Sequence, residues 1–315
     1  ADRFRPGEPI GGSFPTHFMA RNTPSNPLLG IGCMLLAGLL MTGNNAILKW
    51  LTTGYPVGEI IFIRGVFIWL PIAYFIARSG GFLSIRITRL RLHAVRAGCV
   101  AFSAFIYILG LRYLPLADVT AIGFSTPLFV TALATFLLGE NVGWRRWSAV
   151  MVGFLGIIVI TRPTGDVVTA AVLLPLGAAF WTAIRDMVTR RMVTTESSNA
   201  ILVTSTAAVM IAGLCTSPFG WKMPTSQDFA LMAGAGLFSG FGHYFMIEAF
   251  RHAEAVIVSP FRYLTIVWAI ALGYLIWGDF PDSYVLGGVA LVICSGLYIL
   301  HREIVVRRRR LAEKS

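Results

Sequence analysis

The feature that most restricts the fold of this chain is a series of long apolar stretches that hold few charged residues. A helix needs about 20 apolar residues to cross the hydrocarbon core of a bilayer, and it must satisfy every backbone polar group within itself. Hydrophobic residues make up 56% of the 315 residues and charged residues only 13%, too few to give a soluble protein of this length a polar surface. The sequence therefore predicts an all-α integral membrane protein.

Ten stretches are long enough to span the membrane. We place the transmembrane helices at residues 28–49, 57–77, 94–113, 116–138, 145–161, 167–187, 199–218, 228–250, 255–277 and 284–301. The connections between them are short and leave no room for a separate catalytic or binding domain. Residues 1–27 are polar and lack the order of a cleaved signal peptide, so we expect a disordered cytoplasmic tail there. A basic cytoplasmic tail is expected at 302–315.

The net charge of +11 raises the question of a nucleic-acid partner, and the positions of the positive residues answer it. With a cytoplasmic N-terminus, nineteen Lys and Arg fall in inner loops and tails, four in outer loops and three inside spans. This asymmetry favours both termini in the cytoplasm and a bacterial cytoplasmic (inner) membrane. Arginines beside the membrane serve topology or bind anionic lipid, so we expect lipid and no nucleic acid as a partner.

An internal repeat divides the chain into two halves, 28–161 and 167–301. The sequence FSAFIYILGLRYLPLADVTAI begins at Phe102, and FSGFGHYFMIEAFRHAEAVIV begins at Phe238. Ala117-Asp118 corresponds to Ala253-Glu254, and Gly139-Glu140 corresponds to Gly278-Asp279 after a shift of three residues. Five helices is an odd number, so the two halves must enter the membrane from opposite sides. The repeat predicts two inverted-topology units around a central cavity and transport by alternating access.

The chain resembles the drug/metabolite transporter superfamily in its EamA-type ten-helix branch. The resemblance covers about Leu28 to His301, and it is carried by Arg64, LRYLPLADVTAI from Leu111, TPLFVTALATFLLGE from Thr126 and SPFRYLTIVWAIALGYLIWGD from Ser259. It implies ten helices around a central cavity and the transport of amino acids, nucleosides, vitamins or other metabolites. Such relatives include amino-acid and drug exporters, a riboflavin importer and S-adenosylmethionine carriers, so the resemblance alone does not choose the substrate.

Charged residues inside apolar spans are costly and are therefore the first candidates for a binding site. Arg64 fits either a structural role, bonded to backbone carbonyls, or a substrate contact. Arg262 follows Pro260 in the ninth span and needs an anion, which we expect to be Glu248 or the substrate itself. His243 lies near the middle of the eighth span, where it would bind a ligand, carry a proton or simply pack.

Neutral and aromatic candidates complete the predicted substrate site. They are Asn45, Tyr107, Phe124, Trp181 and Tyr263. A ring beside a polar atom suits a flat or amphipathic solute, and Arg262 could fix a carboxylate or phosphate on it. We therefore expect a polar or amphipathic metabolite such as an amino acid, S-adenosylmethionine, a vitamin or a carboxylate, with an anionic substrate as one alternative. Proton coupling through Glu248, Glu59 or His243 stays open, because exchange and facilitated diffusion need no titrating residue.

Two other classes of function compete with transport. A membrane enzyme acting on lipid-linked substrates would need a nucleophile with its base or a metal cluster, and the sequence contains no such motif. A receptor or scaffold would need a sizeable loop or tail for its partners. The four cysteines lie in different spans without the spacing of a metal or redox site, so we expect no cofactor and no metal. Transport is the favoured function, and we expect no enzyme.

Overall fold

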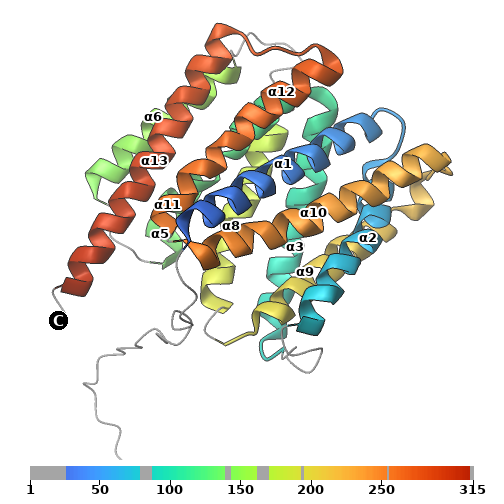
Figure 1. Ribbon diagram of the computed structural model, residues 1–315, viewed down its shortest axis with the longest axis horizontal. Helices are drawn as coiled ribbons and strands as arrows, with labels where there is room; N and C mark the ends of the chain where they lie inside the picture. The colour runs from blue at the N-terminus through green and yellow to red at the C-terminus, as the bar shows by residue number, and fades with distance from the viewer. Residues whose placement is uncertain are drawn as a thin grey trace, which may run out of the picture.

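The computed structural model describes residues 26–78, 87–138, 143–161, 170–192, 195–253 and 255–312, and this part of the chain is helical between short turns (Figure 1). Eight of its helical segments are long and apolar enough to cross a membrane. The predicted all-α membrane fold is confirmed. Gly139, Glu140 and Glu254 of the predicted repeat, and residues 1–25 of the predicted N-terminal tail, lie outside the described residues.

The helices follow the predicted order of spans. The first half comprises α1 (Pro27–Leu51), α2 (Val57–Arg78), α3 (Leu90–Tyr113), α4 (Leu116–Gly123), α5 (Thr126–Leu138) and α6 (Trp144–Thr161). The second half comprises α8 (Leu173–Met192), α9 (Ser198–Leu214), the short 3₁₀ helix η3 (Ser217–Phe219), α10 (Ser226–His252), α11 (Ala255–Val258), the 3₁₀ helix η4 (Ser259–Leu264), α12 (Thr265–Trp277) and α13 (Ser283–Ala312). The fourth span is therefore α4 with α5, and the ninth is α11, η4 and α12.

Polar side chains fix where several helices begin. The side chain of Asn26 accepts a hydrogen bond from the Leu29 amide (3.2 Å), and Pro27 occupies the first helical turn. Ser197 caps α9 in the same way, through the Ala200 amide at 3.2 Å. These caps satisfy amide groups that have no partner inside the helix.

Some predicted helix ends differ from the structure. The sixth span, expected at 167–187, is α8 and continues to Met192, because Arg185, Asp186 and Thr189 find polar partners within the protein. The expected tail 302–315 belongs to α13 as far as Ala312, since nothing in the sequence before Ala312 interrupts the helix. The seventh span, expected to reach residue 218, ends as a helix at Leu214. Apolar length located the spans, and local polar contacts decided where they stop.

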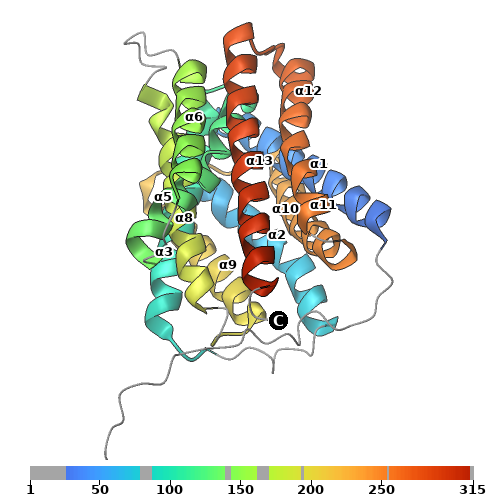
Figure 2. The same ribbon diagram turned by 90° about the vertical axis from the view of Figure 1, so that its left-hand side faces the viewer.

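The packing of the helices is unchanged when the two halves of the chain are exchanged. Helices α1, α2 and α3 of the first half correspond to α8, α9 and α10 of the second. In the first half, α1 and α2 both pack on α10; in the second half, their counterparts α8 and α9 both pack on α3. Helix α12 packs on α1 as α5 packs on α8, while α6 and α13 lie side by side (Figures 1 and 2). A twofold relation between the halves produces this pattern, as inverted repeats require. The contacts define group 1 (α1, α10, α11, η4 and α12) and group 2 (α3, α4, α5 and α8).

The larger apolar cluster includes a tightly packed part at one end of the bundle, which we name the Lys49 end. Seven large side chains there are 2% exposed or less and belong to one cluster: Leu48, Leu51, Ile60, Ile61, Leu111, Leu114 and Leu116. At the opposite end, named the Glu196 end, a smaller cluster comprises Met34, Ala249, Ala253 and Val258, all from group 1. The two groups are thus packed firmly together at the Lys49 end.

Candidate functional site

Both halves of the chain contain a broken span at corresponding positions. Between α4 and α5 the helix is interrupted at Phe124 and Ser125, and Pro127 follows, which has no amide hydrogen to donate. In the second half, α11 gives way to η4, which contains Pro260 in its first turn. The rings of Phe124 and Tyr263 are 4.7 Å apart, so the two breaks meet inside the bundle. Broken helices expose backbone polar groups where a transporter binds its solute.

A row of hydrogen bonds connects three helices next to these breaks. Arg64 of α2 donates to the side-chain oxygen of Asn44 (3.1 Å), and Asn44 donates to Asn45 (2.9 Å). Asn45 donates to the hydroxyl of Tyr107 on α3 (3.0 Å). The sequence predicted Arg64, Asn45 and Tyr107 separately, and the structure brings them together. Because α1 belongs to group 1 and α3 to group 2, this row also connects the two groups.

Arg64 is incompletely paired. One terminal nitrogen of its guanidinium contacts Asn44, while its Nε is buried without a hydrogen-bond partner. A guanidinium presents five N–H donors and keeps its charge when buried. The expected structural role, with the side chain bonded to backbone carbonyls, has no support in these contacts.

His243 lies on α10 between the side of the helix that packs on α2 and the side that packs on α1. Gly240 is packed on Pro71 of α2, and Gly242 is packed on Met41 of α1. His243 is nevertheless exposed, and its Nδ1 donates to the Ser239 carbonyl at 2.7 Å. The other ring nitrogen is left for a further contact in the angle between α1 and α2.

The internal repeat gives His243 a counterpart. Tyr107 follows Phe102 at the same spacing as His243 follows Phe238. Two equivalent positions on α3 and α10 therefore carry polar side chains.

Helix α8 contributes Trp181 and, one turn further on, Arg185. Trp181 packs edge to face on Phe102 of α3, with ring centroids 5.2 Å apart. Arg185 pairs with its neighbour Asp186 at 2.7 Å. The sequence predicted Trp181 but not Arg185, which stood at the expected end of its span.

Arg96 is a second charged residue that the sequence analysis did not assign to the site. Its guanidinium donates to Thr189 (2.8 Å), to the Ile201 carbonyl (3.3 Å) and to the Ser205 hydroxyl. All three partners are neutral. Its position inside the third apolar span was the signal that could have identified it.

The expected ion pair between Arg262 and Glu248 is not formed. Glu248 pairs instead with Arg251 (2.7 Å) and with His252 (3.5 Å). These residues follow Glu248 by three and four positions on the same helix, where side chains meet without any tertiary contact. Arg262 is exposed on η4, and its contact with substrate stays a prediction.

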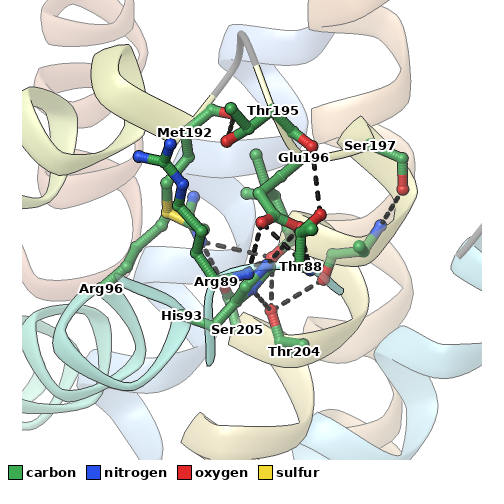
Figure 3. A network of polar contacts seen from close by, with 12 residues as sticks. Thr88, Arg89, His93, Arg96, Met192, Thr195, Glu196, Ser197, Thr204 and Ser205 are labelled. Atoms are coloured by element: carbon green, nitrogen blue, oxygen red, sulfur yellow. Dashed lines mark hydrogen bonds and ion pairs between the residues drawn. The ribbon is translucent and has the colours of Figure 1, made fainter. Parts of the chain in front are cut away.

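A separate polar network lies at the Glu196 end (Figure 3). The carboxylate of Glu196 accepts hydrogen bonds from the backbone amides of Thr88 (3.0 Å) and Arg89 (2.7 Å), and His93 contacts it at 3.1 Å. The Thr88 and Arg89 amides and the imidazole hold the pKa of Glu196 at about 2, below its ordinary value of 4.5. The network fixes the connection between α8 and α9 to the start of α3, and the sequence analysis did not predict it.

Comparisons with known proteins agree with this architecture. A model of the EamA-like transporter family matches residues 28–162 and 169–300. A solved crystal structure that is 17% identical aligns over 86% of this chain and 95% of its own with a TM-score of 0.60, which shows a shared fold.

Curated relatives cover most of the chain. An S-adenosylmethionine uptake transporter of Rickettsia conorii is 30% identical over 88% of this chain and 94% of its own length. A riboflavin transporter of Rhizobium johnstonii is 30% identical over 91% and 95%. A pseudopaline exporter of Pseudomonas aeruginosa is 26% identical over 84% and 93%.

Proposed function

The chain belongs to the EamA-like transporter family and is a membrane transporter of small metabolites, and from this premise we propose that it carries a polar or amphipathic solute by alternating access. The family match and the named relatives support transport over the two other classes of function. No catalytic residue is assigned in this proposal.

One observation carries the mechanism: the broken fourth and ninth spans meet at Phe124 and Tyr263. Interrupted helices free backbone donors and acceptors, and irregular backbone at membrane depth is tolerated where it is covered by protein or lines a cavity. A solute held between the breaks would contact both repeats. Rocking of group 1 against group 2 would then open the same site to either side of the membrane.

The excess of positive residues in one set of loops supports a placement of the protein in a bacterial cytoplasmic membrane, with both termini in the cytoplasm. The Lys49 end then faces outward and the Glu196 end faces the cytoplasm. In this orientation the firmly packed end is the outer one.

Transport into proteoliposomes tests the proposal. The purified protein is reconstituted and offered radiolabelled S-adenosylmethionine, riboflavin, amino acids and carboxylates, one at a time. We expect saturable uptake of at least one class above that of empty vesicles. If no compound enters faster than into empty vesicles, and preloading with the same compound gives no exchange, the proposed transport is wrong.

Two additions to this assay examine finer points. A pH gradient that accelerates uptake would support proton coupling, whereas uptake driven only by the solute gradient would support facilitated diffusion. Replacement of Arg262 by Ala is expected to lower uptake if Arg262 contacts the solute. Uptake unchanged by Arg262→Ala would remove this residue from the site.

A further inference from the structure

We propose that Arg64 anchors an anionic group, a carboxylate or a phosphate, on the transported metabolite. This inference rests on the proposed transport function and names the chemistry of the substrate. It assigns the anion to the second span, whereas the sequence favoured Arg262 in the ninth.

The guanidinium of Arg64 has fewer hydrogen bonds than its donors can form. Arg64 has a hydrogen bond to the neutral Asn44 side chain, and its Nε is buried without a partner. A guanidinium cannot lose its proton to escape burial, and a neutral amide does not balance its charge. Carboxylates and phosphates match its parallel N–H groups with two hydrogen bonds at once. Among the described residues, the only hydrogen-bond partner of Arg64 is this neutral amide.

Two carboxylates of the Lys49 end are engaged with other groups. Glu59, five positions before Arg64 on α2, is 1% exposed and accepts a hydrogen bond from the Lys222 amide at 3.0 Å. Asp279 lies 3.8 Å from the Lys49 ammonium. Within the described part of the chain, no carboxylate forms an ion pair with Arg64.

The surrounding charges favour an anion as well. The hydrogen-bond partners of Arg96 among the described residues are neutral, and the charge of Arg185 is offset by Asp186. Arg64 and Arg96 thus place two guanidinium groups with neutral partners inside apolar spans, and a solute anion would balance positive charge there.

The row of hydrogen bonds from Asn44 to Tyr107 holds the partner of Arg64 in place. Asn44 is 3% exposed, and the row through Asn45 reaches Tyr107 of group 2. An anion bound at Arg64 would thus lie where the two groups are connected. Binding there would change contacts of both group 1 and group 2, as alternating access requires.

Matched pairs of compounds that differ in one anionic group test the inference. The pairs are tryptophan with tryptophan amide, pantothenate with pantothenol, and riboflavin 5′-phosphate with riboflavin. Binding of each compound to the full-length protein in detergent is measured by calorimetry and by thermal shift. The same measurements are made on Arg64→Gln and Arg64→Lys. Arg251→Gln is the control, because it removes a positive charge from a side chain that is 65% exposed.

In a pair that binds, the anionic member should bind the native protein at least about tenfold more tightly than the neutral member. Arg64→Gln should weaken binding of the anionic member by about 10- to 100-fold and leave the neutral member unchanged. Arg64→Lys should retain part of the preference, because it keeps the charge without the paired N–H groups. Arg251→Gln should bind like the native protein.

Equal binding of both members to the native protein would overturn the inference without any variant. Undiminished binding of the anionic member by a folded Arg64→Gln would overturn it too. If Arg64→Gln does not fold, the native comparison and Arg64→Lys decide. If no metabolite binds or is transported, the proposed function is wrong, and the inference fails with it.

Discussion

At the scale of single residues, Glu196 makes the pH dependence of stability predictable. Its pKa in the folded protein is about 2, whereas the ordinary value is 4.5. A carboxylate with a lowered pKa stabilises the fold fully above pH 4.5, and this contribution is lost as the pH falls toward 2. We expect Glu196→Gln to lower the melting temperature by a few degrees at pH 7. The difference between native protein and variant should shrink between pH 5 and pH 3.

Melting curves of both proteins in detergent at pH 7, 5, 4 and 3 measure this difference. Glu248→Gln is the comparison, because it removes a carboxylate whose partners, Arg251 and His252, lie on the same helix. A difference between native protein and Glu196→Gln that is constant from pH 7 to pH 3 would contradict the assigned role of the carboxylate.

Tyr107 permits a second prediction at this scale. Its hydroxyl accepts the hydrogen bond from Asn45, so Tyr107→Phe leaves the half-buried Nδ2 group of Asn45 without this acceptor. A loss of this kind costs about 1–2 kcal/mol, which lowers the melting temperature. Tyr113→Phe, at a ring that is 54% exposed on the same helix, should change little. Equal melting temperatures for Tyr107→Phe and the native protein would show that this hydrogen bond contributes nothing.

The sequence identified residues of the site better than their partners. Arg64, Asn45 and Tyr107 could be chosen because polar groups inside apolar spans are conspicuous. Their common hydrogen-bond row could not be predicted, since it depends on how α1, α2 and α3 pack. The expected pair of Arg262 with Glu248 was wrong because Arg251 and His252 reach Glu248 within one helical turn.

At the scale of the helices, contact between α6 and α13 depends on glycine. A Cβ atom added to Gly288 would lie 2.5 Å from the Gly156 carbonyl oxygen, whereas one added to Gly287 meets nothing within 4 Å. We expect Gly288→Ala to force the two helices apart and to destabilise the protein by about 1–3 kcal/mol. Gly287→Ala should be neutral or slightly stabilising, because Ala favours the helix.

Melting temperatures and detergent-extracted yields of the two variants test this difference between neighbouring positions. Similar behaviour of Gly288→Ala and Gly287→Ala would show that the contact between α6 and α13 is not tight.

The membrane spans themselves were predictable from apolar length. The interruptions in the fourth and ninth spans were indicated only by Pro127 and Pro260, and their extent is set by the packing of Phe124 on Tyr263.

At the scale of the whole molecule, the two groups are held together at one end. Besides the packed core, Lys49 of α1 donates to the Leu114 carbonyl at the end of α3 (2.7 Å), which connects group 1 to group 2. The apolar cluster at the Glu196 end lies within group 1. If the halves rock as inverted repeats do, this arrangement corresponds to a site open toward the Glu196 end.

Cysteine labelling tests this state directly. The four native cysteines, Cys33, Cys99, Cys215 and Cys294, are first replaced by serine. His243→Cys, at an exposed position between α1 and α2, should then react with a membrane-impermeant maleimide. In the proposed orientation it should react at least about tenfold faster in inside-out vesicles than in right-side-out vesicles, because the packed core blocks the Lys49 end.

Leu48→Cys is the matched control, since Leu48 is 1% exposed within the packed end and should resist labelling from both sides. A transported solute should slow the labelling of His243→Cys, either by occupying the site or by shifting the groups toward the other state. Faster labelling of His243→Cys in right-side-out vesicles, together with labelling of Leu48→Cys, would mean that the Lys49 end opens first. The assignment of a closed outer end would then be wrong, although the positions of the helices would stand.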